Sequence, residues 1–189
     1  LMEGCIQRGR DLHAELPYSF LNLRSSGFTN LINALSALDT IVFRTQRATL
    51  GDLRQALQTN FREAADLRRQ LLEAPKWGND DDLADRWALA WLKRREAIQQ
   101  RLEQEPGCPR LLPEMVVRSL HHLDGRDTGA TPDGRLAGEP LADSVGAQLG
   151  TARGGPTALL NSVCKLQPAR YWPGGYNLNL TLPSLVWGN

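Results

Sequence analysis

The hydrophobic side chains in the first half of the chain recur at helical spacing. Four of them follow one another at intervals of three and four residues: Leu31, Leu35, Leu38 and Val42. This spacing predicts an amphipathic helix from about Phe28 to Phe43, with these four side chains buried on one face.

A second helix is predicted from Thr49 to Ala74. Thr49 and Asp52 have the spacing of a capping box, with Asp in the place of the usual Glu. The apolar positions that follow keep helical spacing: Leu53, Leu57, Phe61, Ala64, Leu67 and Leu71. Pro75 ends this helix, because proline cannot continue the backbone hydrogen bonding.

Three successive aspartates, Asp80 to Asp82, mark the start of a third helix, since the helix dipole favours negative charge at its N-terminus. The predicted apolar face consists of Leu83, Trp87, Ala90, Trp91 and Ile98. The aspartates also resemble half of a calcium-binding loop, but the required spacing and the terminal Glu are missing. Charge at a helix N-terminus is therefore the simpler interpretation.

The composition changes near residues 105–109, after which Gly and Pro are frequent. Strands are predicted over residues 18–23, 115–120 and 176–182, the last because polar and apolar side chains alternate there. Residues 157–163 fit either a strand or a short helix. Long helices interspersed with single strands favour a mixed α/β fold in which each strand requires partners.

Charge and composition exclude several classes of protein. The 189 residues contain 22 Lys and Arg against 21 Asp and Glu, so no global field favours nucleic acid or an anionic membrane surface as a partner. The apolar runs are too short and interrupted to predict a membrane-spanning helix. The sequence begins at Leu1 without features of a signal peptide, and we expect it to be cut from a larger chain. Its three cysteines form no Cys-x-x-Cys pair, which fits unpaired thiols in the cytoplasm.

Two short motifs suggest chemistry that their surroundings do not support. His121 and His122 lie in a β-prone region, where neighbouring side chains point to opposite faces and cannot readily share a metal ion. We expect one buried and one exposed histidine and no metal site. Cys5 has only Arg8 and Arg10 as basic neighbours in sequence, so a packed, inert thiol is favoured over a nucleophile.

The most unusual stretch is the sequence Thr131, Pro132, Asp133, Gly134 and Arg135. Proline fixes one backbone angle, aspartate can cap its own backbone and glycine accepts a positive φ, so a tight turn is predicted. An ordered surface loop is favoured. The alternative is a phosphate-binding nest, although the Gly-Lys-Ser/Thr ending of a P-loop is missing.

Several segments together resemble the glycyl radical enzymes of the pyruvate formate-lyase type. Residues 131–143, Thr-Pro-Asp-Gly-Arg-Leu-Ala-Gly-Glu-Pro-Leu-Ala-Asp, differ from that family's signature only at Leu136, where Lys is usual. Residues 76–82, Lys-Trp-Gly-Asn-Asp-Asp-Asp, are similar to its Lys-Tyr-Gly-Asn-Asp-Asp-Asp segment. Residues 155–163 and 174–180 are similar to a late barrel strand. The order and spacing agree, so the resemblance covers nearly the whole chain.

The resemblance implies that residues 1–189 form a later part of a ten-stranded α/β barrel, helical to about residue 105 and rich in Gly and Pro from about 106. It also implies radical cleavage of a small metabolite, of either the formate acetyltransferase or the dehydratase type. In this family an activating enzyme with S-adenosylmethionine and an iron–sulfur cluster forms a glycyl radical, and a cysteine thiyl radical then attacks the substrate. The implied partners are the remaining barrel, that activating enzyme, a small-molecule substrate and, as one option, a second copy in a homodimer.

Neither radical-bearing residue of the family is recognised in the sequence. No Arg-Val-x-Gly-Tyr motif is present, and the context of Cys5 resembles the helix that precedes the family's Ala-Arg-Tyr-Asn-Phe strand. No catalytic residue and no bound cofactor are therefore predicted within the chain.

Tyr18 and Phe20 correspond to the Tyr and Phe of that strand and are the substrate-pocket candidates, although Leu16 and Pro17 replace small residues before them. Residues 131–135 carry over as a structural loop near the barrel. The alternative to an enzyme segment is a non-catalytic module that packs on another chain.

Overall fold

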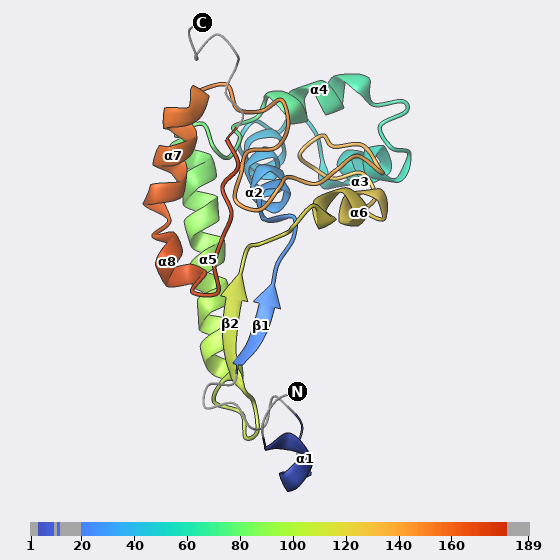
Figure 1. Cartoon of the computed structure of the whole chain (residues 1–189). Helices are drawn as coiled ribbons and strands as arrows, with labels where there is room; N and C mark the ends of the chain where they lie inside the picture. The colour runs from blue at the N-terminus through green and yellow to red at the C-terminus, as the bar shows by residue number, and fades with distance from the viewer. Residues whose placement is uncertain (1–3, 10, 12–19, 181–189) are drawn as a thin grey trace, which may run out of the picture.

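The computed structural model describes residues 4–9, 11 and 20–180 of the chain. Figure 1 shows a helical body with a pair of strands leading into it. The strands are β1 (Phe20–Arg24) and β2 (Arg110–Glu114). The helices are α1 (Cys5–Arg8), α2 (Phe28–Ala37), the π-helix η2 (Leu38–Arg44), α3 (Leu50–Gln58), α4 (Ala65–Glu73), α5 (Asp82–Leu102), α6 (Leu120–Arg126), α7 (Gly155–Lys165) and α8 (Pro168–Tyr171).

The two strands are parallel, with Phe20 opposite Arg110 and Arg24 opposite Glu114. The described part of the first predicted strand is thereby confirmed. The strand predicted over residues 115–120 is wrong, because Arg118 and Ser119 adopt positive φ and α6 begins at the next residue. Of the strand predicted over 176–182, the described residues form one parallel bridge, between Tyr176 and Met115, and residues 181 and 182 lie outside the described part.

The first predicted helix is confirmed in extent, since α2 and η2 together run from Phe28 to Arg44. The predicted buried stripe is confirmed only in part. Leu35, Leu38 and Val42 are partly buried and pack against the core clusters, whereas Leu31 is 37% exposed. Four of the eight buried residues of α2 are polar. These four are Thr29, Asn30, Asn33 and Ser36.

The second predicted helix is two helices, α3 and α4. The capping box is present, because the Asp52 amide donates to Thr49 Oγ1 at 3.1 Å and the Thr49 amide donates to Asp52 Oδ2 at 2.8 Å. The helix breaks at Asn60 and Phe61, which both have positive φ (52° and 58°). Phe61 is nevertheless buried with Leu53 in one core cluster, so the break turns the chain while keeping its apolar side chains inside.

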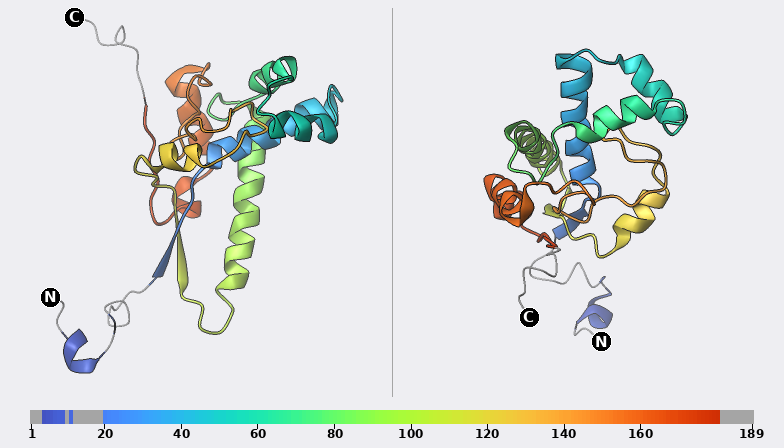
Figure 2. Two further views of the ribbon diagram at one scale, coloured as in Figure 1. Left: turned by 90° about the vertical axis from the view of Figure 1, so that its right-hand side faces the viewer. Right: turned by 90° about the horizontal axis from the view of Figure 1, so that it is seen from above.

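The third predicted helix is confirmed as α5, where the Asp81 carboxylate accepts hydrogen bonds from the Leu83 and Ala84 amides at 2.9 and 3.2 Å. Ala90 and Ile98 of its predicted apolar face are exposed, which corrects that part of the prediction. Residues 157–163 belong to α7, which settles them as helical. Seen from above in Figure 2, α5 and α7 lie to one side of α2 and α6 lies to the other.

The main core lies where α2, α5, α7 and the segment around Trp172 meet. Phe28 is at its centre, with ring centroids 5.6 Å from Trp77 and 5.2 Å from Trp172, both edge-on. Ala88 and Leu92 line the α5 side of the cluster. Within the described part of the chain, no helix is both long enough and apolar enough to cross a membrane.

Asn33 connects α2 to two distant loops. Its side-chain oxygen accepts a hydrogen bond from the Trp77 amide at 2.7 Å, and its side-chain nitrogen donates to Gln148 Oε1 at 3.1 Å. Trp77 in turn donates through its indole nitrogen to the Val145 carbonyl at 2.9 Å. The buried polar face of α2 therefore fixes loop backbone that has no strand or helix partner.

We predict that Asn33→Leu lowers the free energy of unfolding by about 1–3 kcal/mol, because the buried Trp77 amide loses its acceptor. Urea denaturation of the full chain measures the change. Gln100→Leu, at an exposed position of α5, is the matched control and should change stability by less than about 0.5 kcal/mol. Equal effects of the two substitutions would contradict the proposed importance of the polar face.

Candidate functional site

The segment Thr131–Arg135 forms the predicted tight turn. The Gly134 amide donates to the Thr131 carbonyl at 3.0 Å, and the Thr131 amide donates to the Arg135 carbonyl at 3.1 Å. Gly134 has φ of 93°, and an added Cβ would lie 2.8 Å from Leu72, so both conformation and space require glycine there. The expectation of a surface loop is wrong, because Asp133 and Arg135 are 0% and 1% exposed.

Arg135 is the hydrogen-bonding centre of this loop. Its Nε donates to Thr131 Oγ1 at 3.2 Å, and its two terminal nitrogens donate to backbone carbonyls. The carbonyls are those of Gly125, Thr128, Gly129, Leu136 and Glu139. Burial lowers the pKa of Arg135, while Asp133 and Glu139 act in the opposite direction, and the guanidinium remains charged at neutral pH. The donors of Arg135 serve the chain's own backbone, which argues against the phosphate-nest alternative.

Asp133 joins the loop to α2. Its carboxylate accepts hydrogen bonds from Asn30 Nδ2 at 2.8 Å, from Thr131 Oγ1 and from the Arg135 amide. The side-chain oxygen of Asn30 accepts a hydrogen bond from the backbone amide of Ala142 at 2.7 Å. Pro132 lies between these anchors and is partly buried. This geometry favours the role of a structural loop, which stays a prediction.

A cavity of about 430 Å³ opens beside the C-terminus of α4. Lys76 lines it with 5% of its surface exposed, and its ammonium donates to the Leu71 carbonyl. Burial lowers the pKa of Lys76 to about 8; the negative charge of Asp133 opposes this shift, and the positive charge of Arg153 adds to it. Asn79 connects two walls of the cavity, since its side-chain oxygen accepts from the Arg153 amide at 2.6 Å.

The aspartates at the start of α5 form ion pairs with Lys165 of α7. Lys165 Nζ lies 2.6 Å from Asp80, 2.7 Å from Asp85 and 3.5 Å from Asp82. The hydrogen bond to Asp80 is the main cause of the raised pKa of Lys165. Over residues 4–9, 11 and 20–180, no three His, Cys, Asp or Glu side chains lie close enough to hold a metal ion.

The two histidines lie in α6 and not in a strand, which corrects the prediction that they point to opposite faces. Their ring centroids are 4.1 Å apart. His121 is partly buried, with Nδ1 3.8 Å from an Asp143 carboxylate oxygen, and His122 is exposed. Cys5 is half-buried in α1, and its expected lack of reactivity stays a prediction.

The two substrate-pocket candidates fall at the start of β1. Tyr18 lies outside the described residues. Phe20 is the first residue of β1 and is 49% exposed, opposite Arg110 of β2. An exposed aromatic ring at this position could pack against another part of a larger protein or against a ligand. The assignment of Phe20 to a substrate pocket stays a prediction.

Comparison with known proteins identifies the family. The family model described as pyruvate formate lyase-like matches residues 1–108. The chain belongs to the pyruvate formate lyase-like family. It is 34% identical to the isethionate sulfite-lyase of Nitratidesulfovibrio vulgaris over 86% of this chain and 20% of that protein. It is 33% identical to the probable dehydratase YbiW of Escherichia coli over 96% of this chain and 24% of that protein.

Solved structures of the same family superpose closely on the chain. A glycyl radical enzyme from Archaeoglobus fulgidus gives a TM-score of 0.85 at 28% identity, covering 100% of this chain and 24% of that one. The glycerol-bound form of the B12-independent glycerol dehydratase from Clostridium butyricum gives 0.81 at 31% identity, covering 94% and 22%. The predicted family and the α/β-barrel fold class are confirmed. This pyruvate formate lyase-like chain spans 20 to 24% of the length of these relatives.

We predict that Arg135→Lys destabilises the chain by roughly 3 kcal/mol or more, because lysine keeps the buried charge but cannot reach the same set of carbonyl groups. Thermal and urea unfolding measure the loss. Arg94→Lys, an exposed position on α5, is the control and should leave stability nearly unchanged. Near-equal stability of the two variants would show that the loop does not depend on the guanidinium.

The lowered pKa of Lys76 predicts a pH-dependent stability. Between about pH 8 and 10.5 the unfolded chain binds a proton that folded Lys76 has lost, so stability rises with pH across this window, by on the order of 3 kcal/mol. Below about pH 8 both states hold the proton and the contribution is constant. Urea denaturation from pH 7 to 11 should show this rise in the native chain and in the control Lys93→Met, but not in Lys76→Met. Identical pH profiles of the native chain and Lys76→Met would show that the pH dependence of stability does not come from Lys76.

Proposed function

We propose that the chain is a barrel segment of a glycyl radical lyase or dehydratase, and that it contributes structure and not the radical-bearing residues. The observation that carries this proposal is that strand β1 is incompletely covered, both on its faces and along its outer edge. In parallel α/β proteins both faces of a strand are normally covered. In β1, however, Phe20 and Leu21 are each about half exposed.

The two edges of the strand pair differ. The edge of β2 that faces away from β1 is occupied, because the Leu111 amide donates to the side chain of Glu103, the residue after α5, at 2.7 Å, and the Leu111 carbonyl accepts from Gln99 of α5 at 3.1 Å. Further along, Pro113 accepts from the Gly174 amide at 2.9 Å. Within the described part of the chain, the opposite edge of β1 pairs with no strand. A strand from the remaining barrel would cover this edge and the exposed aromatic ring beside it.

The radical chemistry is proposed to reside outside the chain. A glycyl radical, formed by a partner that uses S-adenosylmethionine and an iron–sulfur cluster, would oxidise a cysteine elsewhere in the parent protein. Cys5 lacks the family's thiyl-cysteine context and is proposed to be a bystander. Tyr18 and Phe20 are proposed to border the substrate pocket, and residues 131–135 to support the barrel. The parent protein is proposed to act on a small polar metabolite in the cytoplasm.

The test uses the parent polypeptide that contains this chain. Anaerobic incubation with the activating enzyme, S-adenosylmethionine and a reductant should give the electron paramagnetic resonance signal of a glycyl radical. Turnover is then measured with glycerol, isethionate and trans-4-hydroxy-L-proline, which the names of related proteins suggest as a first panel.

Cys5→Ser should retain both the radical signal and turnover, and Phe20→Ala should lower turnover without lowering the radical yield. Loss of turnover in Cys5→Ser would contradict the bystander assignment. A parent polypeptide that forms no radical would favour the non-catalytic module.

A further inference from the structure

The connection between η2 and α3 exposes two large apolar side chains. Phe43, in the last turn of η2, is 63% exposed, and Leu50, the first residue of α3, is 56% exposed. Phe43 is the most exposed of the described Phe, Trp and Tyr residues. Single exposed apolar side chains are common on protein surfaces, so the meaning of this pair depends on the backbone and the charges around it.

The backbone that carries these two side chains is anchored on both sides. Ile41, two residues before Phe43, and Leu53, three residues after Leu50, are buried in the same core cluster. Between them the Arg47 amide donates to the Ile41 carbonyl at 2.9 Å. Phe43 itself lies in a π-helical segment, a rare conformation that often occurs at functional sites. An anchored backbone presents Phe43 and Leu50 with little entropy left to lose on binding.

Two exposed arginines, Arg47 and Arg54, belong to the same connection. Within the described part of the chain, their side chains form no ion pair. The two carboxylates of this region are engaged elsewhere. Asp39 is paired with Arg44 at 3.1 Å, and the Asp52 carboxylate accepts the hydrogen bonds of the capping box.

Glu63, the next carboxylate along the chain, lies on another side of α3. It lines a cavity together with Asp52 and Gln55. Asp52 is two residues, or about 200° of helix rotation, away from both Leu50 and Arg54. The acidic cavity and the exposed apolar side chain therefore lie on opposite faces of α3, and the face of Leu50 and Arg54 keeps its positive charge.

We propose that the η2–α3 connection, residues 43–54, is a docking surface for another segment of the parent polypeptide. That segment would contribute apolar contacts to Phe43 and Leu50 and carboxylates to Arg47 and Arg54. Aromatic residues and arginine are the types enriched at the centres of such interfaces.

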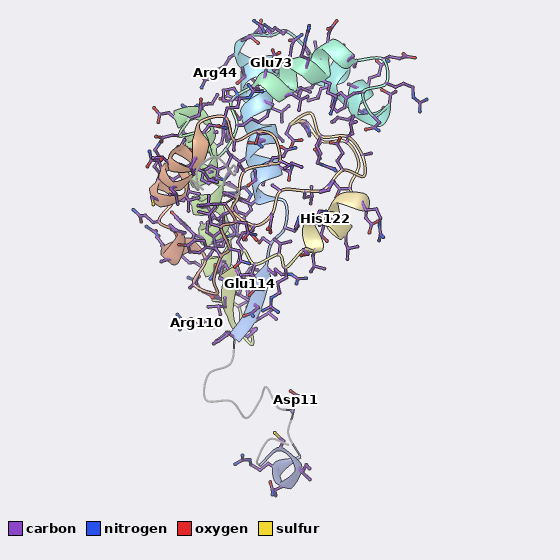
Figure 3. The ribbon with its side chains drawn as sticks, turned by 45° about the horizontal axis from the view of Figure 1, so that its top comes forward. Asp11, Arg44, Glu73, Arg110, Glu114 and His122 are labelled. Atoms are coloured by element: carbon purple, nitrogen blue, oxygen red, sulfur yellow. The ribbon has the colours of Figure 1, made fainter. Side chains whose placement is uncertain are left out.

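The parent protein can supply this segment, because residues 1–189 match only 20 to 24% of the length of their relatives. The surface is separate from the strand pair assigned to the barrel, since Arg44 of η2 and Arg110 of β2 lie at opposite ends of the main body in Figure 3. The inference rests on the proposed function only in that the chain is part of a longer protein.

The experiment is hydroxyl-radical footprinting of the parent polypeptide before activation, with mass spectrometry to measure the oxidation rate of each side chain. The 189-residue chain is the reference for an uncovered surface. Phe43 should be oxidised at least about fivefold more slowly in the parent than in the chain, because the core of an interface excludes water. Phe28, which is 2% exposed, gives the rate of a buried ring. Should the chain alone not fold, the comparison of Phe43 with Phe28 inside the parent still decides.

Charge reversal tests the chemistry of the docked segment. Arg47→Glu combined with Arg54→Glu in the parent should raise the Phe43 oxidation rate to at least about half of its rate in the isolated chain, because like charges then face one another. Arg94→Glu, at an exposed position of α5, is the matched control and should leave the Phe43 rate unchanged. Equal Phe43 rates in these two variants would contradict a docked segment with carboxylates.

Phe20, at the start of β1, separates this inference from the proposed function. Protection of Phe20 without protection of Phe43 in the parent would overturn the docking surface and leave the barrel assignment standing. Lack of protection at both positions would contradict both proposals. Protection of Phe43 that weakens when the parent is diluted would assign the surface to a second copy of the protein, and would also overturn the inference.

Discussion

The structure depends on a row of buried polar side chains on α2. Thr29, Asn30, Asn33 and Ser36 each hydrogen-bond to a loop at least 39 residues away in sequence. These loops contain little regular structure, so their buried backbone groups have few other partners. An unpaired buried amide costs about 1–3 kcal/mol. The row therefore decides where residues 75–77, 133 and 142–148 can lie, and with them the positions of Trp77 and Arg135.

This arrangement supports the proposed role of the chain as a segment of a larger barrel. On one side of the body, α5 and α7 cover an aromatic core. Hydrogen bonds of Arg135 and Asp133 hold the loop of residues 131–135 in place. The strand pair leads out of this fixed body and leaves β1 half exposed. The body thus presents an edge for pairing with a strand of the proposed barrel, and the family's radical-bearing residues are proposed to lie elsewhere in the parent protein.

Features that depend on neighbouring residues could be predicted from the sequence. The capping box of Thr49 and Asp52, the Asp81 cap and the turn at Gly134 are local, and each is present. The buried face of α2 could not be predicted, because asparagine is buried there only through partners more than 40 residues away. The helix break at Phe61 could not be predicted either, because Phe61 adopts a positive φ, a backbone conformation that aromatic residues seldom adopt.

The central claim is that α2 side chains hold the loop backbone, and amide hydrogen exchange tests it most directly. The amides of Trp77 and Ala142 donate to Asn33 and Asn30. Their exchange rates in the native chain should be as slow as those of Ala88 and Leu92 in the core of α5. Exchange at the rate of an exposed loop amide such as that of Gly150 would show that these hydrogen bonds do not persist in solution, and would contradict the account.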